Sequence, residues 1–194
     1  MKEVLRHCNQ ITIENFLPRF DELRAYADRA EYGDVQSDVD GVTYPGISMK
    51  LPEFVVDDVV NRLTDVMGPV TINTLFMRLS TEGMVAPHQA HTDAVMGEAS
   101  LMVYLTPEPY CQGGTAFVRH KENGMDLDPV TDSEVAVWQK DVNNPDMWDT
   151  LEVCEMRPNR ACIFNAARMH CAHPIGGFGD SAKNGRLVLT AFFS

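Results

Sequence analysis

The chain has 194 residues, 44% of them hydrophobic, and a formal net charge of −12 at pH 7. This length and composition are typical of one globular domain that can bury a sizeable core. No apolar run is long enough to cross a membrane, and the polar first residues lack the layout of a secretory signal. Because the chain has no block of Lys and Arg, nonspecific nucleic-acid binding is not expected.

The chain contains five cysteines, an odd number without a Cys-x-x-Cys pair. This pattern is a poor basis for a disulfide framework or a zinc ribbon. We therefore expect mostly buried free thiols in a reducing compartment, which with the polar start indicates a cytoplasmic location. The cysteines are Cys8, Cys111, Cys154, Cys162 and Cys171.

The first third of the chain is predicted to be mainly helical. Residues 18–30 place Phe20, Leu23, Tyr26 and Ala27 on one face of a helix. Residues 52–67 have the same periodicity and are followed by Gly68-Pro69, which ends a helix. The polar stretch 33–48 between them is expected to be a loop.

From residue 70 onward the pattern becomes strand-like, with short apolar runs separated by Gly, Pro and Asn. About eight such runs in succession indicate a β-sandwich or barrel. We therefore predict a single domain over 1–194, in which 1–69 form mainly helical support and 70–194 form the β core. The expected strands are 70–79, 99–105, 115–118, 135–138, 151–156, 161–164, 169–175 and 186–193.

Residues 121–150 are acidic and are expected to be mostly loop. Loops of this length in compact domains are often lids or binding loops. A simple connection between two strands is the alternative. As a lid, the segment would become ordered over the substrate and exclude water.

The pair His91 and Asp93 is the first candidate for chemistry. In an extended segment, residues two apart face the same side, so both side chains can reach one metal ion. Two imidazoles and one carboxylate form the facial triad of non-heme Fe(II) sites, so a second histidine from elsewhere would complete it. A His-x-Asp motif alone is weak, because chance matches are common.

Motifs farther along the chain supply the context. They are Tyr-Leu-Thr followed by Gly-Gly-Thr-Ala-Phe within 104–117, and His-Cys-Ala-His-Pro-Ile followed by Gly-Arg-Leu-Val-Leu-Thr-Ala-Phe-Phe within 170–193. With His-Thr-Asp at 91–93, they resemble the 2-oxoglutarate/Fe(II)-dependent dioxygenases, and within them the prolyl-4-hydroxylase-like branch. The match covers roughly the last 120 residues.

The resemblance implies a double-stranded β-helix, or jelly roll, with helices outside it. The family places a Pro four residues after the distal iron-binding histidine, which selects His170 over His173 because of Pro174. Alternation along a strand agrees that only one of the two can reach the metal. The implied ligand set is therefore His91, Asp93 and His170.

The resemblance also implies residues that bind 2-oxoglutarate. Arg186 matches the basic residue of the final strand that pairs with the distal carboxylate. Tyr104 matches a hydroxyl partner of the same carboxylate, although packing in the core is an equally good interpretation. Thr190, four residues after Arg186, could line that pocket. The insertion 176–184 makes the spacing from His170 to Arg186 longer than in many relatives.

The implied reaction is oxidative decarboxylation of 2-oxoglutarate to succinate, coupled to hydroxylation or a related C–H oxidation. It requires Fe(II), 2-oxoglutarate and O2, and ascorbate is compatible with this class. The substrate would be a small molecule or a peptide side chain, and the oligomeric state does not follow from the sequence. Fold and motifs do not identify the substrate.

Further residues are weaker candidates for binding the substrate. Arg168 and Arg78 could bind an anionic substrate, although exposed arginines are the more ordinary interpretation. Trp148 could belong to a lid, and His88 is interpreted as solvated. Two other functions stay open: a catalytically silent jelly-roll binding protein, and a cupin-like zinc or manganese enzyme that does not use 2-oxoglutarate.

Overall fold

The computed structural model describes residues 10–194, so Cys8 lies outside the described residues. The helices are α2 (Phe20–Ala27), α3 (Glu53–Met67) and α4 (Asp132–Asp141), with short 3-10 helices η1 (Glu108–Tyr110) and η2 (Pro145–Met147). The strands are β1 (Ile11–Ile13), β2 (Gly33–Gln36), β3 (Thr43–Ser48), β4 (Ile72–Ser80), β5 (Ala99–Tyr104), β6 (Gly114–His120), β7 (Trp148–Glu155), β8 (Ala161–Asn165), β9 (His170–His173) and β10 (Arg186–Phe193).

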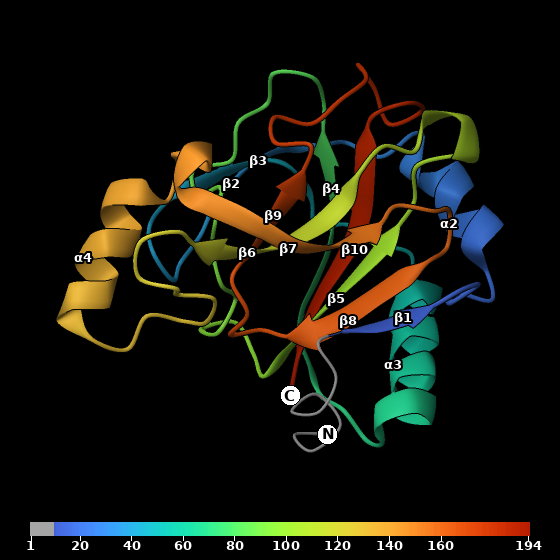
Figure 1. Ribbon diagram of the computed structural model, residues 1–194. Helices are drawn as coiled ribbons and strands as arrows, with labels where there is room; N and C mark the ends of the chain where they lie inside the picture. Colours follow the sequence, from blue (N-terminus) through green and yellow to red (C-terminus); the bar gives the residue numbers. More distant parts are fainter. Residues whose placement is uncertain (1–9) are drawn as a thin grey trace.

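The strands form two antiparallel sheets that face each other (Figure 1). The larger sheet has the order β1-β8-β5-β10-β4-β3-β2, and the smaller one has the order β7-β6-β9. This arrangement is a jelly-roll core, as the sequence predicted. The expected fold class is therefore confirmed.

Helices α2 and α3 pack on the outer face of the larger sheet. Leu23 of α2 and Leu63 of α3 are fully buried there, against β-strand residues such as Leu101 and Leu189. The helix predicted over residues 52–67 ends at Gly68, whose φ of 83° favours glycine. Helices α2 and α3 thus support the larger sheet through an apolar interface.

The opposite face of the larger sheet points into the jelly roll. On β5 and β10, side chains alternate between the two faces, so Tyr104, Val188 and Thr190 point inward. Tyr104 and Val188 pack there with Phe117 and Phe164, whose rings meet edge to face with centroids 5.1 Å apart. This inner face carries the residues that matter for the site.

Two predicted elements were wrong. Residues 33–48, expected to be a loop, form the β2–β3 hairpin at the edge of the larger sheet, where Ile47 pairs with Arg78 of β4. An edge hairpin with one solvated side lacks the apolar alternation of a core strand. The described part of the first 69 residues therefore contributes three short strands besides its two helices.

The stretch 135–138, expected to be a strand, lies inside helix α4. Thr131 and Glu134 form a capping box at its start, with the Thr131 side chain accepting from the Glu134 amide. The run Val-Ala-Val-Trp suggests a strand, but the cap and the contacts of Trp138 favour a helix. The segment 121–150 is thus not mostly loop, because it also contains η2 and the start of β7.

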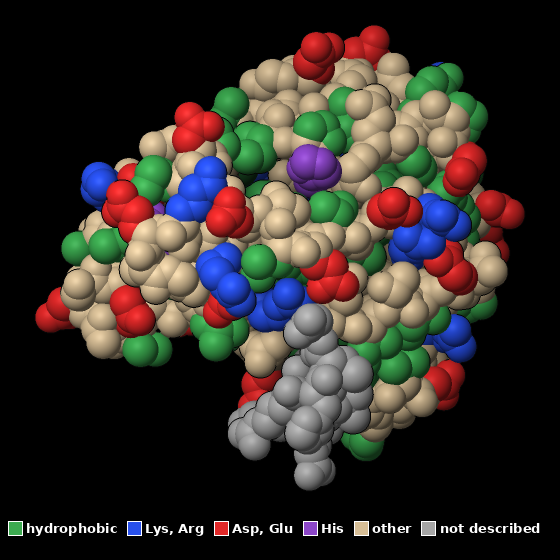
Figure 2. Space-filling model, in the orientation of Figure 1, with side chains coloured by type: hydrophobic (Ala, Val, Ile, Leu, Met, Phe, Trp, Pro, Cys, Tyr) green, Lys and Arg blue, Asp and Glu red, His purple; other side chains and the backbone are tan. Residues whose placement is uncertain are grey.

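Acidic and basic side chains are interspersed on the face shown in Figure 2. Among residues 10–194, no helix is both long and apolar enough to span a membrane. The four cysteines of this part of the chain are free thiols, and only Cys111 is partly exposed.

Candidate metal centre and active site

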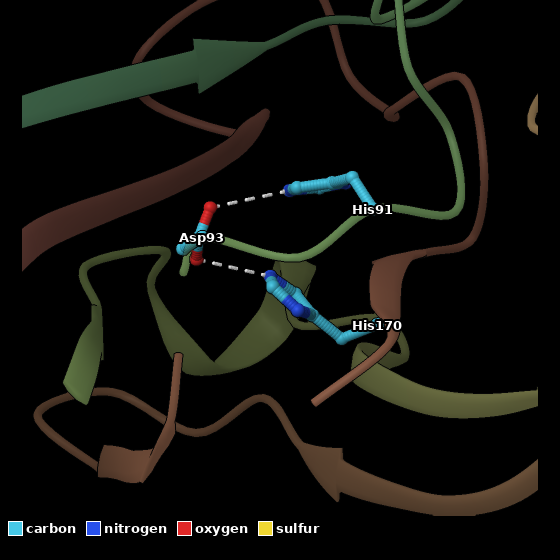
Figure 3. A group of neighbouring side chains, drawn as sticks. All are labelled: His91, Asp93 and His170. Carbon is cyan, nitrogen blue, oxygen red and sulfur yellow. Dashed lines mark ion pairs between the residues drawn. The ribbon is translucent and has the colours of Figure 1, made fainter. Parts of the chain in front are cut away.

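His91, Asp93 and His170 lie together, with their side chains pointing toward one another (Figure 3). Asp93 is placed between the two imidazoles, with 3.7 Å from its Oδ1 to Nε2 of His91 and 3.3 Å from its Oδ2 to Nε2 of His170. One ligand atom from each residue lies within 4.8 Å of the others. The structure therefore brings together the three residues that the motifs selected. His173 is exposed and lies outside the group.

Backbone carbonyls orient both imidazoles. The Nδ1 atom of His91 lies 3.1 Å from the carbonyl oxygen of Gln89, and that of His170 lies 2.9 Å from the carbonyl oxygen of Arg168. A carbonyl oxygen only accepts, so each Nδ1 must carry the proton. In the neutral form of each ring, Nε2 is then the nitrogen without a proton and can donate a lone pair to a metal.

The charge state of the group suits a cation. Burial and the neighbouring His170 lower the pKa of His91 to about 4, so its ring is neutral at pH 7. Burial opposes ionisation of Asp93, but its two histidine neighbours and the Ser100 hydroxyl, 2.9 Å away, lower the pKa of this carboxyl overall. The site therefore offers a cation the neutral imidazole of His91 and the carboxylate of Asp93, with the His170 ring beside them.

One buried atom shows that the set fits a metal ion. Nε2 of His170 is buried and has no hydrogen-bond partner, although it faces the Asp93 carboxylate. Two acceptors that face each other in a buried site are unfavourable unless a proton or a metal cation lies between them. Two histidines and one carboxylate on one side of an ion are the ligand set that suits non-heme Fe(II) and leaves positions open.

Residues 121–150 hold the segment that carries His91, a role that the sequence did not indicate. The indole of Trp138 donates to the Ala90 carbonyl at 2.8 Å, and the Ala90 amide donates to the Val142 carbonyl at 3.0 Å. The Thr92 hydroxyl donates to Asp128. Helix α4 and its flanks therefore support the metal-binding segment from outside.

A pocket opens beside His91. Its walls come from β4, the segment before His91, β9 with the glycines that follow it, and the start of β10. Two arginines, Arg78 and Arg186, line it. Arg186 is only 5% exposed, and its guanidinium donates a hydrogen bond to the carbonyl of Gly114 at 3.2 Å. Its Nε is buried without a partner, so the guanidinium can still bind an acceptor.

The glycine that accepts from Arg186 is required by close packing. A Cβ on Gly114 would lie 1.9 Å from the carbonyl oxygen of Cys154, and its φ is 152°. Gly113-Gly114 thus forms the close turn that the sequence indicated, and it also brings a backbone acceptor to Arg186.

Tyr104 and Thr190 are buried on the same inner face as Arg186, but they do not line this pocket. The Tyr104 hydroxyl donates to the Cys154 carbonyl at 2.8 Å and lies 3.0 Å from the Thr115 hydroxyl. Burial raises the pKa of Tyr104 well above its usual value. The Thr190 hydroxyl contacts the Met102 sulfur at 3.3 Å. In this structure both side chains have partners within the protein.

Of the weaker candidates for substrate contacts, Arg78 lines the pocket, whereas Arg168 and Trp148 do not. The Arg168 guanidinium stacks on the Phe117 ring at 3.8 Å and is 3.9 Å from Glu152. Trp148 is 8% exposed, and its indole donates to the Asp141 carbonyl at 2.9 Å. Because Trp148 belongs to an apolar cluster and not to a lid, its placement argues against contact with a substrate.

His88 differs from the sequence interpretation. It was expected to be solvated, but it lines the pocket, and its side chain is 27% exposed. Its ring lies between Tyr44 of the β2–β3 hairpin and Trp138 of α4, with centroid distances of 6.4 Å and 5.4 Å. Sequence periodicity could not predict this position of His88, because its contacts come from three segments far apart in the sequence.

Solved structures with the same fold define the class. A 2OG-Fe(II) oxygenase family oxidoreductase from Burkholderia pseudomallei has a TM-score of 0.54 at 14% identity, over 99% of this chain and 88% of that one. The alpha-ketoglutarate-dependent epimerase SnoN of nogalamycin biosynthesis has a TM-score of 0.58 at 16% identity, over 98% and 82%. A prolyl hydroxylase from Trichoplax adhaerens has a TM-score of 0.56 at 14% identity, over 98% and 86%.

The chain thus has the fold of the 2-oxoglutarate/Fe(II) oxygenases, as its motifs indicated. It belongs to the family of unknown function DUF6445, whose model matches residues 6–193. No curated protein sequence matches the chain.

Proposed function

We propose that the protein is an Fe(II)- and 2-oxoglutarate-dependent oxygenase that hydroxylates, or oxidises in a related way, a C–H bond of a small molecule or a peptide side chain. The observation that carries the proposal is the joint placement of His91, Asp93 and His170 beside a pocket that contains the buried, under-bonded Arg186. A metal site alone would fit many enzymes. A buried guanidinium in the adjoining pocket favours a carboxylate-bearing cosubstrate.

In this proposal the three ligands hold Fe(II) through Nε2 of each histidine and one carboxylate oxygen of Asp93. The Ser100 hydroxyl and the carbonyls of Gln89 and Arg168 fix the orientation of these ligands. Iron and 2-oxoglutarate, when bound, supply O2 activation with oxidative decarboxylation of 2-oxoglutarate to succinate.

Arg186 would bind the distal carboxylate of 2-oxoglutarate. The guanidinium is buried, so an unmatched positive charge there is costly, and burial lowers the pKa of Arg186. Tyr104, which opposes this lowering, and Thr190 lie on the same inner face as Arg186 but outside the pocket lining, so a role in binding 2-oxoglutarate would require their hydroxyls to change partners. A carboxylate would compensate the buried charge and satisfy the free Nε.

The proposed substrate class rests on the kinds of molecule that are named with the structural relatives. SnoN is an epimerase from nogalamycin biosynthesis, and the Trichoplax enzyme was solved with a peptide fragment of hypoxia inducible factor. Both small molecules and peptide side chains are therefore within reach of this fold. The free thiols of the described chain are consistent with the expected cytoplasmic location.

The test is anaerobic titration of the metal-free protein with Fe(II) and then 2-oxoglutarate, followed by admission of O2. We expect the visible charge-transfer band of the chelate and slow formation of succinate. Arg186→Gln should require much more 2-oxoglutarate for the same band. Tight binding of Zn(II) or Mn(II) with no response to 2-oxoglutarate would favour the cupin-like alternative. Absence of metal binding would favour the silent jelly roll.

A further inference from the structure

A second arginine, Arg78, shares the pocket with Arg186. Arg78 on β4 is directly opposite Val188 of β10, an inner-face residue, so its side chain also points into the jelly roll. Arg186 is two residues before Val188, which makes the two arginines diagonal neighbours on one face. The pocket therefore contains two guanidinium groups on adjacent strands.

Arg78 has no carboxylate at ion-pair distance in the part of the chain that the structure describes, and its Nε is buried without a hydrogen-bond partner. Its guanidinium carbon lies 5.9 Å from the centre of the Tyr44 ring, and the Asp93 carboxylate acts on it only from beyond ion-pair distance. Burial and the nearby Arg186 lower the pKa of Arg78 to about 10, so the side chain stays charged at pH 7.

Other unpartnered polar atoms line the same pocket. Nδ1 of His88 and Oε1 of Gln89 are buried without partners, like Nε of Arg78 and Nε of Arg186. Buried polar groups in proteins nearly always have partners, so such a concentration in one pocket indicates a polar ligand. Because two of these groups, Arg78 and Arg186, are cationic, the bound molecules should place negatively charged groups near both arginines.

A single 2-oxoglutarate would leave Arg78 unmatched. Its keto group and adjacent carboxylate are engaged by the metal, and its distal carboxylate is the partner of Arg186 in the proposed function. We propose that Arg78 binds an anionic oxygen group, a carboxylate or a phosphate, of the substrate that is oxidised. This inference rests on the proposed function and assigns its substrate to acids rather than neutral or cationic molecules.

The position of Arg78 agrees with a role in binding the substrate. Tyr44, its neighbour, belongs to the β2–β3 hairpin and contacts His88, so Arg78 lies where the hairpin meets the pocket wall. The Tyr44 hydroxyl donates to Asp40 at 2.8 Å and leaves the guanidinium free. The hairpin thus packs against Arg78 of β4 without neutralising its charge.

The experiment is a calorimetric titration of the parent protein, Arg78→Gln and Arg119→Gln. Each protein receives Mn(II), then saturating 2-oxoglutarate, and then acetate or sulfate as separate probes of carboxylate and phosphate chemistry. Arg119 is the control because it is an exposed arginine with its own partner, Asp126, at 2.8 Å. Arg186→Gln serves as the reference for loss of 2-oxoglutarate binding.

We expect Mn(II) and 2-oxoglutarate to bind the parent, Arg78→Gln and Arg119→Gln equally. One probe should then bind the parent and Arg119→Gln, and its affinity should fall roughly tenfold or more in Arg78→Gln, since a hydrogen bond to a charged group is lost. The stronger probe identifies the anionic group.

Two results would overturn the inference. One is that neither probe binds the 2-oxoglutarate complex of the parent. The other is that Arg78→Gln weakens 2-oxoglutarate as much as Arg186→Gln does, which would place Arg78 in the cosubstrate site. Failure of the proposed function looks different, because 2-oxoglutarate would then bind none of the proteins. Probe binding to the Mn(II) form would in that case still report on Arg78.

Discussion

His91 and His170 exchange two backbone hydrogen bonds. The His91 amide donates to the His170 carbonyl at 3.0 Å, and the His170 amide donates to the His91 carbonyl at 2.9 Å. The two residues therefore form an isolated antiparallel bridge beside β9, and their rings lie 4.4 Å apart. Two ligands that are 79 positions apart in the sequence are thus set in register by their own peptide groups.

Asp93, the third ligand, is also held in position by a backbone hydrogen bond. The Asp93 amide donates to the Ala166 carbonyl at 2.7 Å, on the turn that leads from β8 to β9. One strand pairing therefore sets the spacing of all three ligands before any metal binds. This arrangement is preorganised, which lowers the entropic cost of metal binding.

Removal of any one ligand should abolish metal binding. His91→Ala, Asp93→Ala and His170→Ala each remove one of three ligands, and no fourth His, Cys, Asp or Glu of residues 10–194 joins the group. We expect the Fe(II)/2-oxoglutarate absorption band to be lost in each variant. His173→Ala is the matched control, because His173 is exposed on the same strand. Loss of the band in His173→Ala, with retention in His170→Ala, would contradict the assignment.

Metal binding should stabilise the fold. A ligand that binds only the native state at about 100 times its Kd adds about 2.7 kcal/mol to the free energy of unfolding. For a domain of this size the gain corresponds to a rise in Tm of roughly 5–10 °C. Thermal unfolding with and without Mn(II) measures it. His170→Ala should show no rise, and an equal rise in that variant would mean that the ion binds elsewhere.

Loss of the Arg186 charge should weaken 2-oxoglutarate. Removal of one partner of a buried charge pair costs about 2–5 kcal/mol, so the affinity should fall on the order of 30-fold or more in Arg186→Ala. Arg186→Lys should retain part of the affinity, because the charge stays but the bidentate geometry is lost. Titration of the Fe(II) form with 2-oxoglutarate measures this. Equal affinity in Arg186→Ala and the parent would rule out the role.

Trp138→Phe should weaken metal binding from outside the ligand set. The change removes the indole hydrogen bond to the Ala90 carbonyl, next to His91, and should cost about 1 kcal/mol of stability. Trp148→Phe is the matched control, because its indole makes an equivalent bond to the Asp141 carbonyl.

Denaturant unfolding and Fe(II) titration distinguish the two tryptophans. Both variants should lose similar stability, but only Trp138→Phe should bind Fe(II) several-fold more weakly, because a less constrained His91 loses preorganisation. Equal Fe(II) affinity in the two variants would show that Trp138 serves stability alone.

The local pattern of the sequence determined the jelly-roll core and the candidates for its site. Alternation in 99–105 and 186–193 predicts strands with one face inward, and the structure has β5 and β10 there. The two-residue spacing of His91 and Asp93, and the Pro174 that follows His170, selected three side chains that the structure brings together. Alternation and two-residue spacing depend on residues near one another along the chain, which periodicity can detect, whereas the Pro174 criterion was implied by the family resemblance.

Only the tertiary structure decided what depends on contacts between distant segments. Helix α4 was missed because the β-branched residues within 135–138 favour a strand locally, whereas the Thr131–Glu134 cap and the Trp138–Ala90 hydrogen bond favour a helix. The unpaired charge of Arg78 likewise became visible only when β3, β4 and β10 were aligned. Burial and partnership are properties of the packed chain, and no local spacing encodes them.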